Sequence, residues 1–360
     1  MTALTTRLDG AIERISTRRI QVPLLRPWGP DVPDVTVIEV VVTDSDGATG
    51  RGFSWTPSIG ASSVQAMLDD DIRSWALGRE ADAKTLWEPL WRHLHEAGGG
   101  GVTTIAMAGL DTALWDLAAR RADRSLADLL GRKRDSVPVY GSGVNLHYPL
   151  SELIDQTRRW LAAGFSAVKI KVGSPDLRRD VERVRVVREL VGSRPLMVDA
   201  NQRWDLAAAV RAMDVLAEFR PAWVEEPLRA DDLDGYRKLA AATDLPIACG
   251  ENLYTRHRFS EFATSGAVTV LQPNVVRVGG ITPLLRIAGD LRDSGVRLAL
   301  HLLPELSGQL ALTLDTETPA EVVDGAGFET LGVLAGPDGM RVEDGRLWAT
   351  GAAGLGIEFR

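Results

Sequence analysis

The segment AVKIKV, residues 167–172, decides how the rest of the chain is interpreted. Its β-branched residues and the flanking Gly164 and Gly173 predict a β-strand. Side chains two apart on a strand share a face, so Lys169 and Lys171 should point the same way. Adjacent ammonium groups repel, and such a pair either binds an anion or lowers one pKa until that lysine can act as a base. A solvated edge strand is the alternative interpretation.

The composition is that of an ordinary globular protein, with 360 residues, 45% of them hydrophobic and 25% charged. The net charge of −8 argues against a nucleic-acid-binding surface. Cys249 is the single cysteine, so no intrachain disulfide can form and nothing indicates an oxidising compartment. We see no signal peptide in Met1–Ile15 and no apolar run of about 18 residues that could span a membrane. We therefore expect a cytoplasmic protein with neither a nucleic-acid nor a membrane partner.

Residues 1–130 predict an α+β domain. Alternating apolar positions predict strands over residues 12–24 and 35–43, and the turn signal Asp44-Ser45-Asp46-Gly47 leads into a further strand over residues 48–55. Helical patterns follow over residues 62–76, 83–95 and 103–121, and Gly131 suits a helix stop.

From Val137 onward, strands alternate with helical segments. The predicted strands cover residues 137–141, 167–172, 196–199, 222–225, 247–249, 268–271, 297–300 and 321–323. This alternation predicts a parallel sheet with helices outside it. The number of strands favours a closed TIM-type barrel over residues 131–325, with a doubly wound open sheet as the alternative. Residues 326–360 carry a hairpin signal at residues 343–346, and we expect them to return to the first domain.

Three acidic residues follow successive predicted strands. Asp199, Glu225 and Glu251 lie 26 residues apart each time (225 − 199 and 251 − 225). Functional side chains of a parallel barrel gather at the carboxyl ends of its strands, so the three carboxylates should meet at one point. Buried carboxylates in that number are costly unless a cation neutralises them, and oxygen-only ligands favour Mg²⁺ over zinc. In the alternative interpretation, each acid is a helix cap or a surface charge.

Together these features resemble the enolase superfamily, in its mandelate racemase and muconate lactonising enzyme branch. The motifs that carry the resemblance are Lys169-Ile170-Lys171, Val198-Asp199-Ala200-Asn201, Val224-Glu225-Glu226-Pro227, Cys249-Gly250-Glu251-Asn252, Gln272-Pro273-Asn274 with Gly279-Gly280-Ile281-Thr282, and His301. The resemblance covers essentially the whole chain. It implies a modified (β/α)7β barrel, an N-terminal α+β capping domain and a C-terminal segment that returns to the cap. The Lys-x-Lys motif with a strand-seven histidine is similar to the mandelate racemase subgroup.

The resemblance implies a Mg²⁺-dependent reaction that starts by removing the proton α to a substrate carboxylate. It assigns Mg²⁺ to the three acids as ligands, with Lys169 helping to stabilise the enediolate. Lys171 is expected to be the base, and Lys169 to lower its pKa. His301 is expected on the opposite face, as a second base or as the acid that protonates a departing hydroxyl.

Two positions depart from the family's pattern. Asn274 stands where the subgroup has an aspartate that hydrogen-bonds the histidine. An amide cannot offset the charge of an imidazolium, so we expect a lower pKa for His301 and dehydration rather than racemisation. On strand eight, either Glu321 or Asp324 could be the family's carboxylate. Glu305, just after His301, is a third acid nearby that could equally cap its helix.

The capping domain is expected to set specificity. Residues 25–29 and 53–55 resemble the family's two cap loops, and Arg26 would suit a second anionic group on the substrate. We expect Asn201, Asn274 and Trp28 to contact the substrate, although Trp28 could equally be a packing residue. The substrate is expected to be a small carboxylate, and the protein a homo-oligomer.

Four functional hypotheses follow. The first is a Mg²⁺-dependent lyase that dehydrates a hydroxy acid or sugar acid, and the second is a racemase or epimerase using the same site. The third is a barrel aldolase that uses Lys169 or Lys171 as a Schiff base, which leaves the three carboxylates unexplained. The fourth is a non-catalytic binding module derived from such an enzyme.

Overall fold

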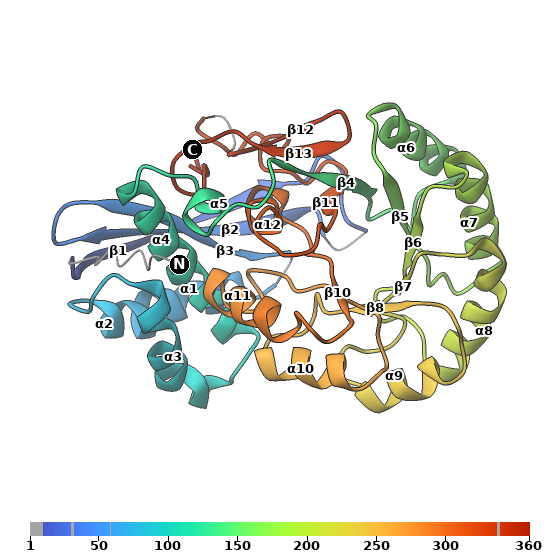
Figure 1. Ribbon diagram of the computed structural model, residues 1–360, viewed down its shortest axis with the longest axis horizontal. Helices are drawn as coiled ribbons and strands as arrows, with labels where there is room; N and C mark the ends of the chain where they lie inside the picture. Colours follow the sequence, from blue (N-terminus) through green and yellow to red (C-terminus); the bar gives the residue numbers. More distant parts are fainter. Residues whose placement is uncertain (1–9, 30–31, 58, 337–338) are drawn as a thin grey trace.

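The computed structural model describes residues 10–29, 32–57, 59–336 and 339–360. An antiparallel sheet with its helices lies at one side of the molecule, and a ring of parallel strands with outer helices lies at the other (Figure 1). The first nine residues of the predicted capping domain lie outside the described residues. Within the described part of the chain, no helix is long and apolar enough to cross a membrane.

The chain begins with a sheet in the order β1 (Ile12–Pro23), β2 (Asp34–Asp44) and β3 (Thr49–Thr56). The predicted turn between β2 and β3 is confirmed. The side chain of Asp44 accepts the N–H groups of Asp46 and Ala48, both at 3.0 Å. Gly47 has a φ of 79°, which glycine adopts without steric strain. This turn fixes the register of β2 against β3.

Helix α4 is the central element of the capping domain. The helical elements here are α1 (Ala61–Ala66), the π-helical turn η1 (Met67–Ile72), α2 (Arg73–Ala76), α3 (Ala83–Leu94), the 3₁₀ turn η2 (His95–Ala97), α4 (Val102–Arg121) and α5 (Leu126–Leu129). Helix α4 approaches β3 so closely that a Cβ on Gly52 would lie 2.2 Å from the main-chain nitrogen of Ala113. Almost all of α4 is buried, because the sheet packs on one side of it and the barrel on another.

The parallel strands form a closed barrel. Its strands are β4 (Ser136–Ser142), β5 (Ala167–Lys171), β6 (Leu196–Asp199), β7 (Val224–Glu225), β8 (Ile247–Cys249), β9 (Val270–Leu271), β10 (Arg297–Leu298) and β11 (Ala320–Val323). Neighbours in sequence pair in parallel from β4 to β10, and β11 returns to pair with β4. Between β10 and β11, the hydroxyl of Thr318 donates to the carbonyl oxygen of Leu298. The doubly wound alternative is therefore wrong.

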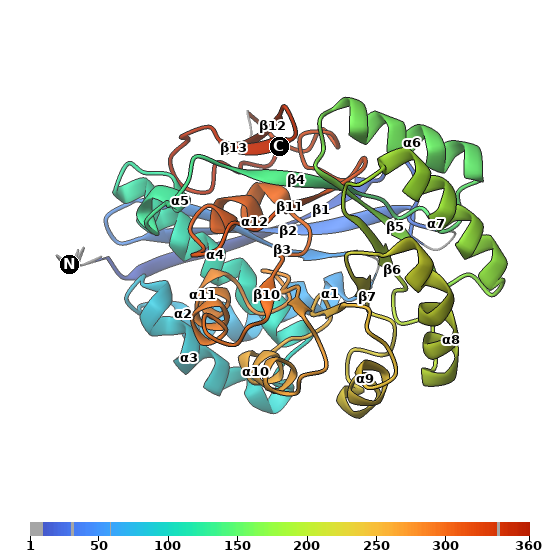
Figure 2. The same ribbon diagram turned by 45° about the vertical axis from the view of Figure 1, so that its right-hand side comes forward.

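A helix follows each of the first seven barrel strands. These helices are α6 (Leu150–Ala162), α7 (Leu177–Val191), α8 (Leu206–Leu216) with the 3₁₀ turn η3 (Ala217–Phe219), α9 (Leu233–Ala240), α10 (Arg256–Thr264), α11 (Ile281–Asp290) and α12 (Pro304–Ala311). They lie outside the strands, as Figure 2 shows for α6 to α9. No helix separates β11 from the tail in the described chain, which confirms the predicted (β/α)7β architecture.

Strand β5 lies between β4 and β6, and all five of its residues are buried. The edge-strand interpretation of Lys169 and Lys171 is therefore wrong. Lys171 pairs in register with Asp199 of β6, and Asp199 pairs with Glu225 of β7. These three side chains thus lie at one height in the barrel. The partner of Glu225 on β8 is Ala248, so Glu251 lies three residues past that height (251 − 248) and its side chain must reach back.

The C-terminal segment contacts both parts of the molecule. The hairpin signal is confirmed by β12 (Met340–Glu343) and β13 (Arg346–Ala349), and β13 pairs antiparallel with β4. Near the end of the chain, the ring of Phe359 packs edge-on against Phe53 of β3, with ring centres 5.7 Å apart. We retain the division into residues 1–130, 131–325 and 326–360 as a proposal.

Asp111 of α4 links the capping domain to the barrel. Its Oδ2 accepts the N–H of Thr282 at 3.0 Å, in the first turn of α11. Among the described residues, its Oδ1 has no hydrogen-bond partner. Burial raises the pKa of Asp111 to about 7, because the loss of hydration outweighs the hydrogen bonds from Thr282. The ionised carboxylate is therefore a destabilising element at this junction.

Asp111→Asn should remove this pH dependence. The pKa of Asp111 in the folded state lies above 3.8, the ordinary value of an aspartate, which we take for the unfolded state. The folded state therefore binds more protons than the unfolded state between about pH 4 and pH 7. The stability of the natural protein should therefore fall as the pH rises, by at most about 4 kcal/mol from this group. Urea unfolding at about pH 5.5 and about pH 8 measures the free energy of unfolding. Relative to the natural protein, the variant should be more stable at about pH 8 than it is at about pH 5.5. The exposed-site variant Asp135→Asn serves as the control, and identical pH slopes for Asp111→Asn and the natural protein would contradict the prediction.

Candidate functional site

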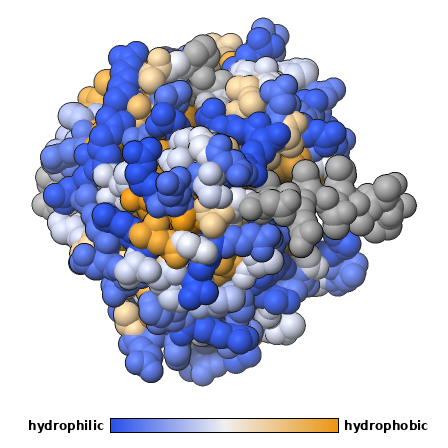
Figure 3. All heavy atoms as spheres, turned by 90° about the vertical axis from the view of Figure 1, so that its left-hand side faces the viewer, coloured by the Kyte–Doolittle hydropathy of each residue, from blue (hydrophilic) through white to orange (hydrophobic). Residues whose placement is uncertain are grey.

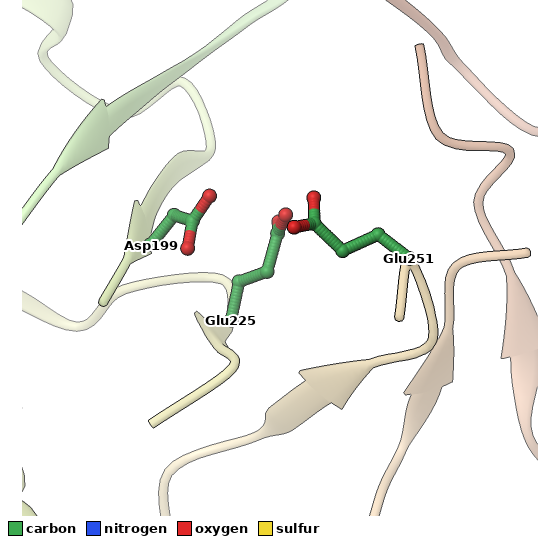
Figure 4. Close-up of side chains that lie close together, drawn as sticks. All are labelled: Asp199, Glu225 and Glu251. Atoms are coloured by element: carbon green, nitrogen blue, oxygen red, sulfur yellow. The ribbon is translucent and has the colours of Figure 1, made fainter. Parts of the chain in front are cut away.

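The three predicted metal ligands meet at the carboxyl end of the barrel. Asp199 and Glu225 end β6 and β7, and Glu251 follows β8. Each offers a carboxylate oxygen within 4.8 Å of the other two, and all three residues are buried. Figure 4 shows the three side chains pointing toward one another. Gly250 allows this approach, because a Cβ there would lie 2.6 Å from the main-chain nitrogen of Gln272.

Each of the three carboxylates is paired with one of the three predicted catalytic groups. The Nζ of Lys171 contacts Asp199. The Nζ of Lys169 lies 2.7 Å from Glu225, and the Nε2 of His301 lies 2.6 Å from Glu251. Because the strands follow one another around the barrel, Lys171 and His301 lie at the two ends of the row of acids. A ligand placed over the acids would have a lysine at one side and an imidazole at the other.

The strand-eight carboxylate that faces the site is Glu321. Its Oε1 lies 2.8 Å from the Nζ of Lys169, and its Oε2 accepts the N–H of Leu302 at 3.0 Å. Asp324 instead accepts hydrogen bonds from Gln156 and Arg159, both at 2.8 Å, outside the row of acids. Burial raises the pKa of Glu321, but the charge and hydrogen bond of Lys169 together with the charge of His301 outweigh it and lower the pKa to about 2.

Glu305 lies outside the row of acids. It is in the first turn of α12, and its Oε1 accepts the N–H of Phe328 at 2.6 Å. It therefore helps to fix the segment that follows β11.

The orientation of His301 is set by Asn274. The Nδ2 of Asn274 lies 3.0 Å from the Nδ1 of His301. The Oδ1 of Asn274 accepts the N–H groups of Val276 and Arg277 at 3.0 and 3.1 Å. The amide therefore cannot be reversed without placing its NH₂ against two N–H donors. Asn274 must donate to Nδ1, so the proton of the neutral imidazole lies on Nε2, where it faces Glu251.

Carboxylates outweigh the effects that lower the pKa of Lys171 and His301. Burial lowers the pKa of Lys171 and Lys169 lowers it further, as expected, but the Asp199, Glu251 and Glu225 carboxylates together outweigh both and the pKa is raised. Burial also lowers the pKa of His301, and the charge and hydrogen bond of Glu251 together with the charge of Glu321 outweigh it. The lower pKa of His301 beside Asn274 than beside an aspartate stays a prediction. In contrast, burial raises the pKa of Glu225 to about 7 despite its contact with Lys169.

Of the predicted substrate-binding residues, Asn201 and Asn274 lie beside this row. Asn201 follows Asp199 with a φ of 44°, and its N–H donates to Asp199 Oδ1 at 2.8 Å. Trp28 packs on Trp55, with ring centres 6.1 Å apart, and lines a pocket of about 330 Å³ between the cap and the barrel. Arg26 lines the same pocket but already pairs with Glu152, so it is not a free anion site. Substrate contact by Asn201, Asn274 and Trp28 stays a prediction.

Sequence reasoning missed several side chains that hold the acids in place. The Nε2 of Gln272 donates to Glu225 at 2.7 Å. The Nε1 of Trp223 donates to the same carboxylate at 3.1 Å. Its position two residues before Glu225 on one strand was the available signal. Arg277 donates to the carbonyl oxygen of Glu251 at 3.1 Å, a contact that only the folded chain reveals. Cys249 is free and buried.

Comparisons with known proteins agree with this geometry. The family model described as mandelate racemase / muconate lactonizing enzyme, N-terminal domain, matches residues 31–131, and the one described as enolase C-terminal domain-like matches residues 152–360. The chain is 38% identical to a 3,6-anhydro-α-L-galactonate cycloisomerase of Streptomyces coelicolor, over 96% of each protein. It is 36% identical to an L-talarate/galactarate dehydratase of Salmonella typhimurium, over 90% of this chain and 80% of the relative.

A solved structure gives the same result. The crystal structure of a racemase from Streptomyces coelicolor with bound magnesium superposes with a TM-score of 0.91 and 37% identity, covering 97% of each chain. The family matches extend over both the capping domain and the barrel, and they include the strands that carry the acids. The chain therefore belongs to the mandelate racemase / muconate lactonizing enzyme family of the enolase superfamily, as its motifs predicted.

Proposed function

We propose that this protein is a Mg²⁺-dependent enzyme that removes the α proton of an acid sugar and eliminates the oxygen substituent on the next carbon. The observation that carries the proposal is the row formed by Lys171, the three carboxylates and His301. The relatives confirm the predicted class of enzyme, since they are named as dehydratases and cycloisomerases. The Schiff-base aldolase is disfavoured, because both lysines are held by carboxylates of the same site.

The donor set fits Mg²⁺. Asp199, Glu225 and Glu251 would hold the ion, because they offer only oxygen atoms, lie close together and are buried. Bound there, Mg²⁺ supplies Lewis-acid stabilisation of the negative charge that develops on the substrate carboxylate. The relative solved with bound magnesium supports this choice of metal.

The two lysines have different tasks in this proposal. Lys171 is the base, and its partner Asp199 would be one of the residues that hold the metal. With the charge of Asp199 shared with a cation, the protonated form of Lys171 would be favoured less. Lys169 stays between Glu225 and Glu321, with 1% of its side chain exposed. It therefore remains a fixed positive charge beside the reacting carboxylate.

His301 is the acid. As an imidazolium it presents an Nε2–H at the end of the row opposite Lys171, where a departing oxygen would need protonation. The relatives are named as a cycloisomerase and a dehydratase, which is why we propose elimination ahead of racemisation.

One elimination serves two kinds of substrate. In an open-chain acid sugar the oxygen on the carbon next to the α carbon is a hydroxyl, so elimination releases water and gives a keto acid. In a 3,6-anhydro acid that oxygen belongs to a ring, so elimination opens the ring and conserves mass. The 38% identity to a cycloisomerase over 96% of both proteins makes ring opening the second candidate. Galactarate, L-talarate and 3,6-anhydro-L-galactonate should be assayed by product mass and keto-acid formation.

Lys171→Ala should abolish exchange of the α proton. In heavy water with Mg²⁺, the natural protein should incorporate deuterium at the α carbon of its substrate, and the variant should do so at least about 100-fold more slowly, since it lacks the base. Proton NMR measures the exchange. Lys238→Ala, an exposed site on α9, is the matched control. Undiminished turnover after removal of divalent ions by a chelator would contradict the proposal.

Asn274→Asp should add a second base. An aspartate accepts a hydrogen bond from Nδ1–H and raises the pKa of His301, which leaves Nε2 free to take a proton from the opposite face. The variant should exchange the α proton of the substrate's α-epimer, which the natural protein should leave intact. Deuterium incorporation into each epimer provides the measurement. A natural protein that already interconverts the epimers would show that Asn274 does not restrict His301.

The cytoplasmic location and the homo-oligomer stay predictions. Figure 3 shows the face at the capping-domain end, which is mostly hydrophilic with a hydrophobic patch near its centre. A patch of this kind is what a self-association surface requires, so it supports the homo-oligomer. Sedimentation velocity on the full chain would give the assembly state.

A further inference from the structure

The main chain of Lys171 is held by a side chain where its neighbouring strand has ended. The ladder between β4 and β5 stops at the pair Ser142 and Lys169. Two residues further on, the N–H of Lys171 is accepted by the Oδ1 of Asn145 at 3.0 Å, and Asn145 is fully buried. The side-chain amide thus replaces the strand carbonyl that β4 no longer provides. On the other side, the N–H of Val172 donates to the main-chain oxygen of Asp199 at 2.9 Å.

The direction of the Asn145 amide is fixed by a chain of hydrogen bonds. The carboxylate of Asp324 can only accept, so Gln156 must present its Nε2, which lies 2.8 Å away. The Oε1 of Gln156 then faces Asn145 and accepts from its Nδ2 at 2.9 Å. This leaves the Oδ1 of Asn145 for Lys171. Asp324 is therefore excluded as the strand-eight carboxylate of the site but determines how Asn145 is oriented.

Arg183 of α7 fixes the loop that carries Asn145. It is 2% exposed and donates to the carbonyl oxygens of Asn145 and Tyr148 at 2.8 and 3.0 Å. It also approaches the Oδ1 of Asn145 at 3.3 Å. Within the described part of the chain, no carboxylate lies within ion-pair distance of this guanidinium. A buried cation that bonds chiefly to main-chain carbonyls holds those carbonyls in place, since leaving them would strand its donors.

We propose that Asn145 is a positioning residue for proton abstraction, which acts by fixing the main chain of Lys171. The inference rests on the proposed function, in which Lys171 is the base. Asp324, through Gln156, and Arg183 hold Asn145 in the orientation that accepts the Lys171 N–H. The helices that carry Gln156 and Arg183, α6 and α7, lie side by side outside β4 and β5 in Figures 1 and 2. We call the hydrogen bond from the Lys171 N–H to the Oδ1 of Asn145 the main-chain clamp. Displacing a catalytic base by about 1 Å can lower the rate about 100-fold, so this clamp matters for catalysis.

Asn145→Ala tests the clamp without any substrate. Amide hydrogen exchange of the full chain with Mg²⁺, resolved to single residues by fragmentation mass spectrometry, should rise at least about 10-fold at Lys171. It should stay unchanged at Val172, which keeps its bond to Asp199. Gln309→Ala is the matched control, because it removes a buried amide that bridges Ala127 and Leu355 away from β5. Unchanged exchange at Lys171 in Asn145→Ala would overturn the inference.

The positioning role is tested by kinetics with the same variants. With galactarate, or whichever of the three acids named above the natural protein converts, Asn145→Ala should lower kcat for α-proton exchange about 10- to 100-fold with KM within about 3-fold. Asn145→Asp keeps an acceptor for Lys171 but sets a second acceptor against the Oε1 of Gln156, so it should restore only part of kcat. An equal loss of kcat in Gln309→Ala, or a kcat of Asn145→Asp no higher than that of Asn145→Ala, would overturn the role. If the natural protein exchanges no α proton at all, the proposed function fails, and amide exchange alone decides whether the clamp exists.

Discussion

The structure depends on one electrostatic constraint, which is the burial of acids inside a parallel barrel. Asp199, Glu225, Glu251 and Glu321 are all at most about a tenth exposed, and desolvating a carboxylate costs several kcal/mol unless a partner offsets it. Three basic side chains offset four carboxylates here, with Lys169 bridging Glu225 and Glu321. Neither group would be stable in the barrel without the other. The two lysines, His301 and the acids therefore form one unit in which the opposite charges offset each other in part, which explains why Lys169 and Lys171 can both be buried.

The rest of the fold brings these charges to one place. The short strands end at a common height, and Gly250 lets the chain turn inward so that Glu251 can reach the other acids. Gln272 and Trp223 donate to Glu225 and fix its carboxylate. Asn145 completes the pairing of β5 where β4 ends. These contacts come from different strands and loops, so the site is held by the closed barrel and not by any single segment.

The chemistry depends on which atom carries each proton. Asn274 and an aspartate are close in shape, yet the amide donates to His301 where a carboxylate would accept. That exchange of donor for acceptor moves the imidazole proton to the nitrogen that faces the acids. The capping domain is held to the barrel by the hydrogen bond between Asp111 and Thr282.

The sequence by itself determined the architecture, the family and the residues of the row. Strand–helix alternation predicts the barrel because each strand–helix unit must bury one face. The 26-residue spacing predicts that the three acids meet because parallel strands end at the same edge of the barrel. Only the tertiary structure decided between Glu321 and Asp324, which are three residues apart on one short segment. It also revealed the carboxylates that raise the pKa of Lys171 and of His301. The physical reason is the same in each case: these outcomes depend on distances of a few ångströms between side chains from different strands, and spacing along the chain does not encode such distances.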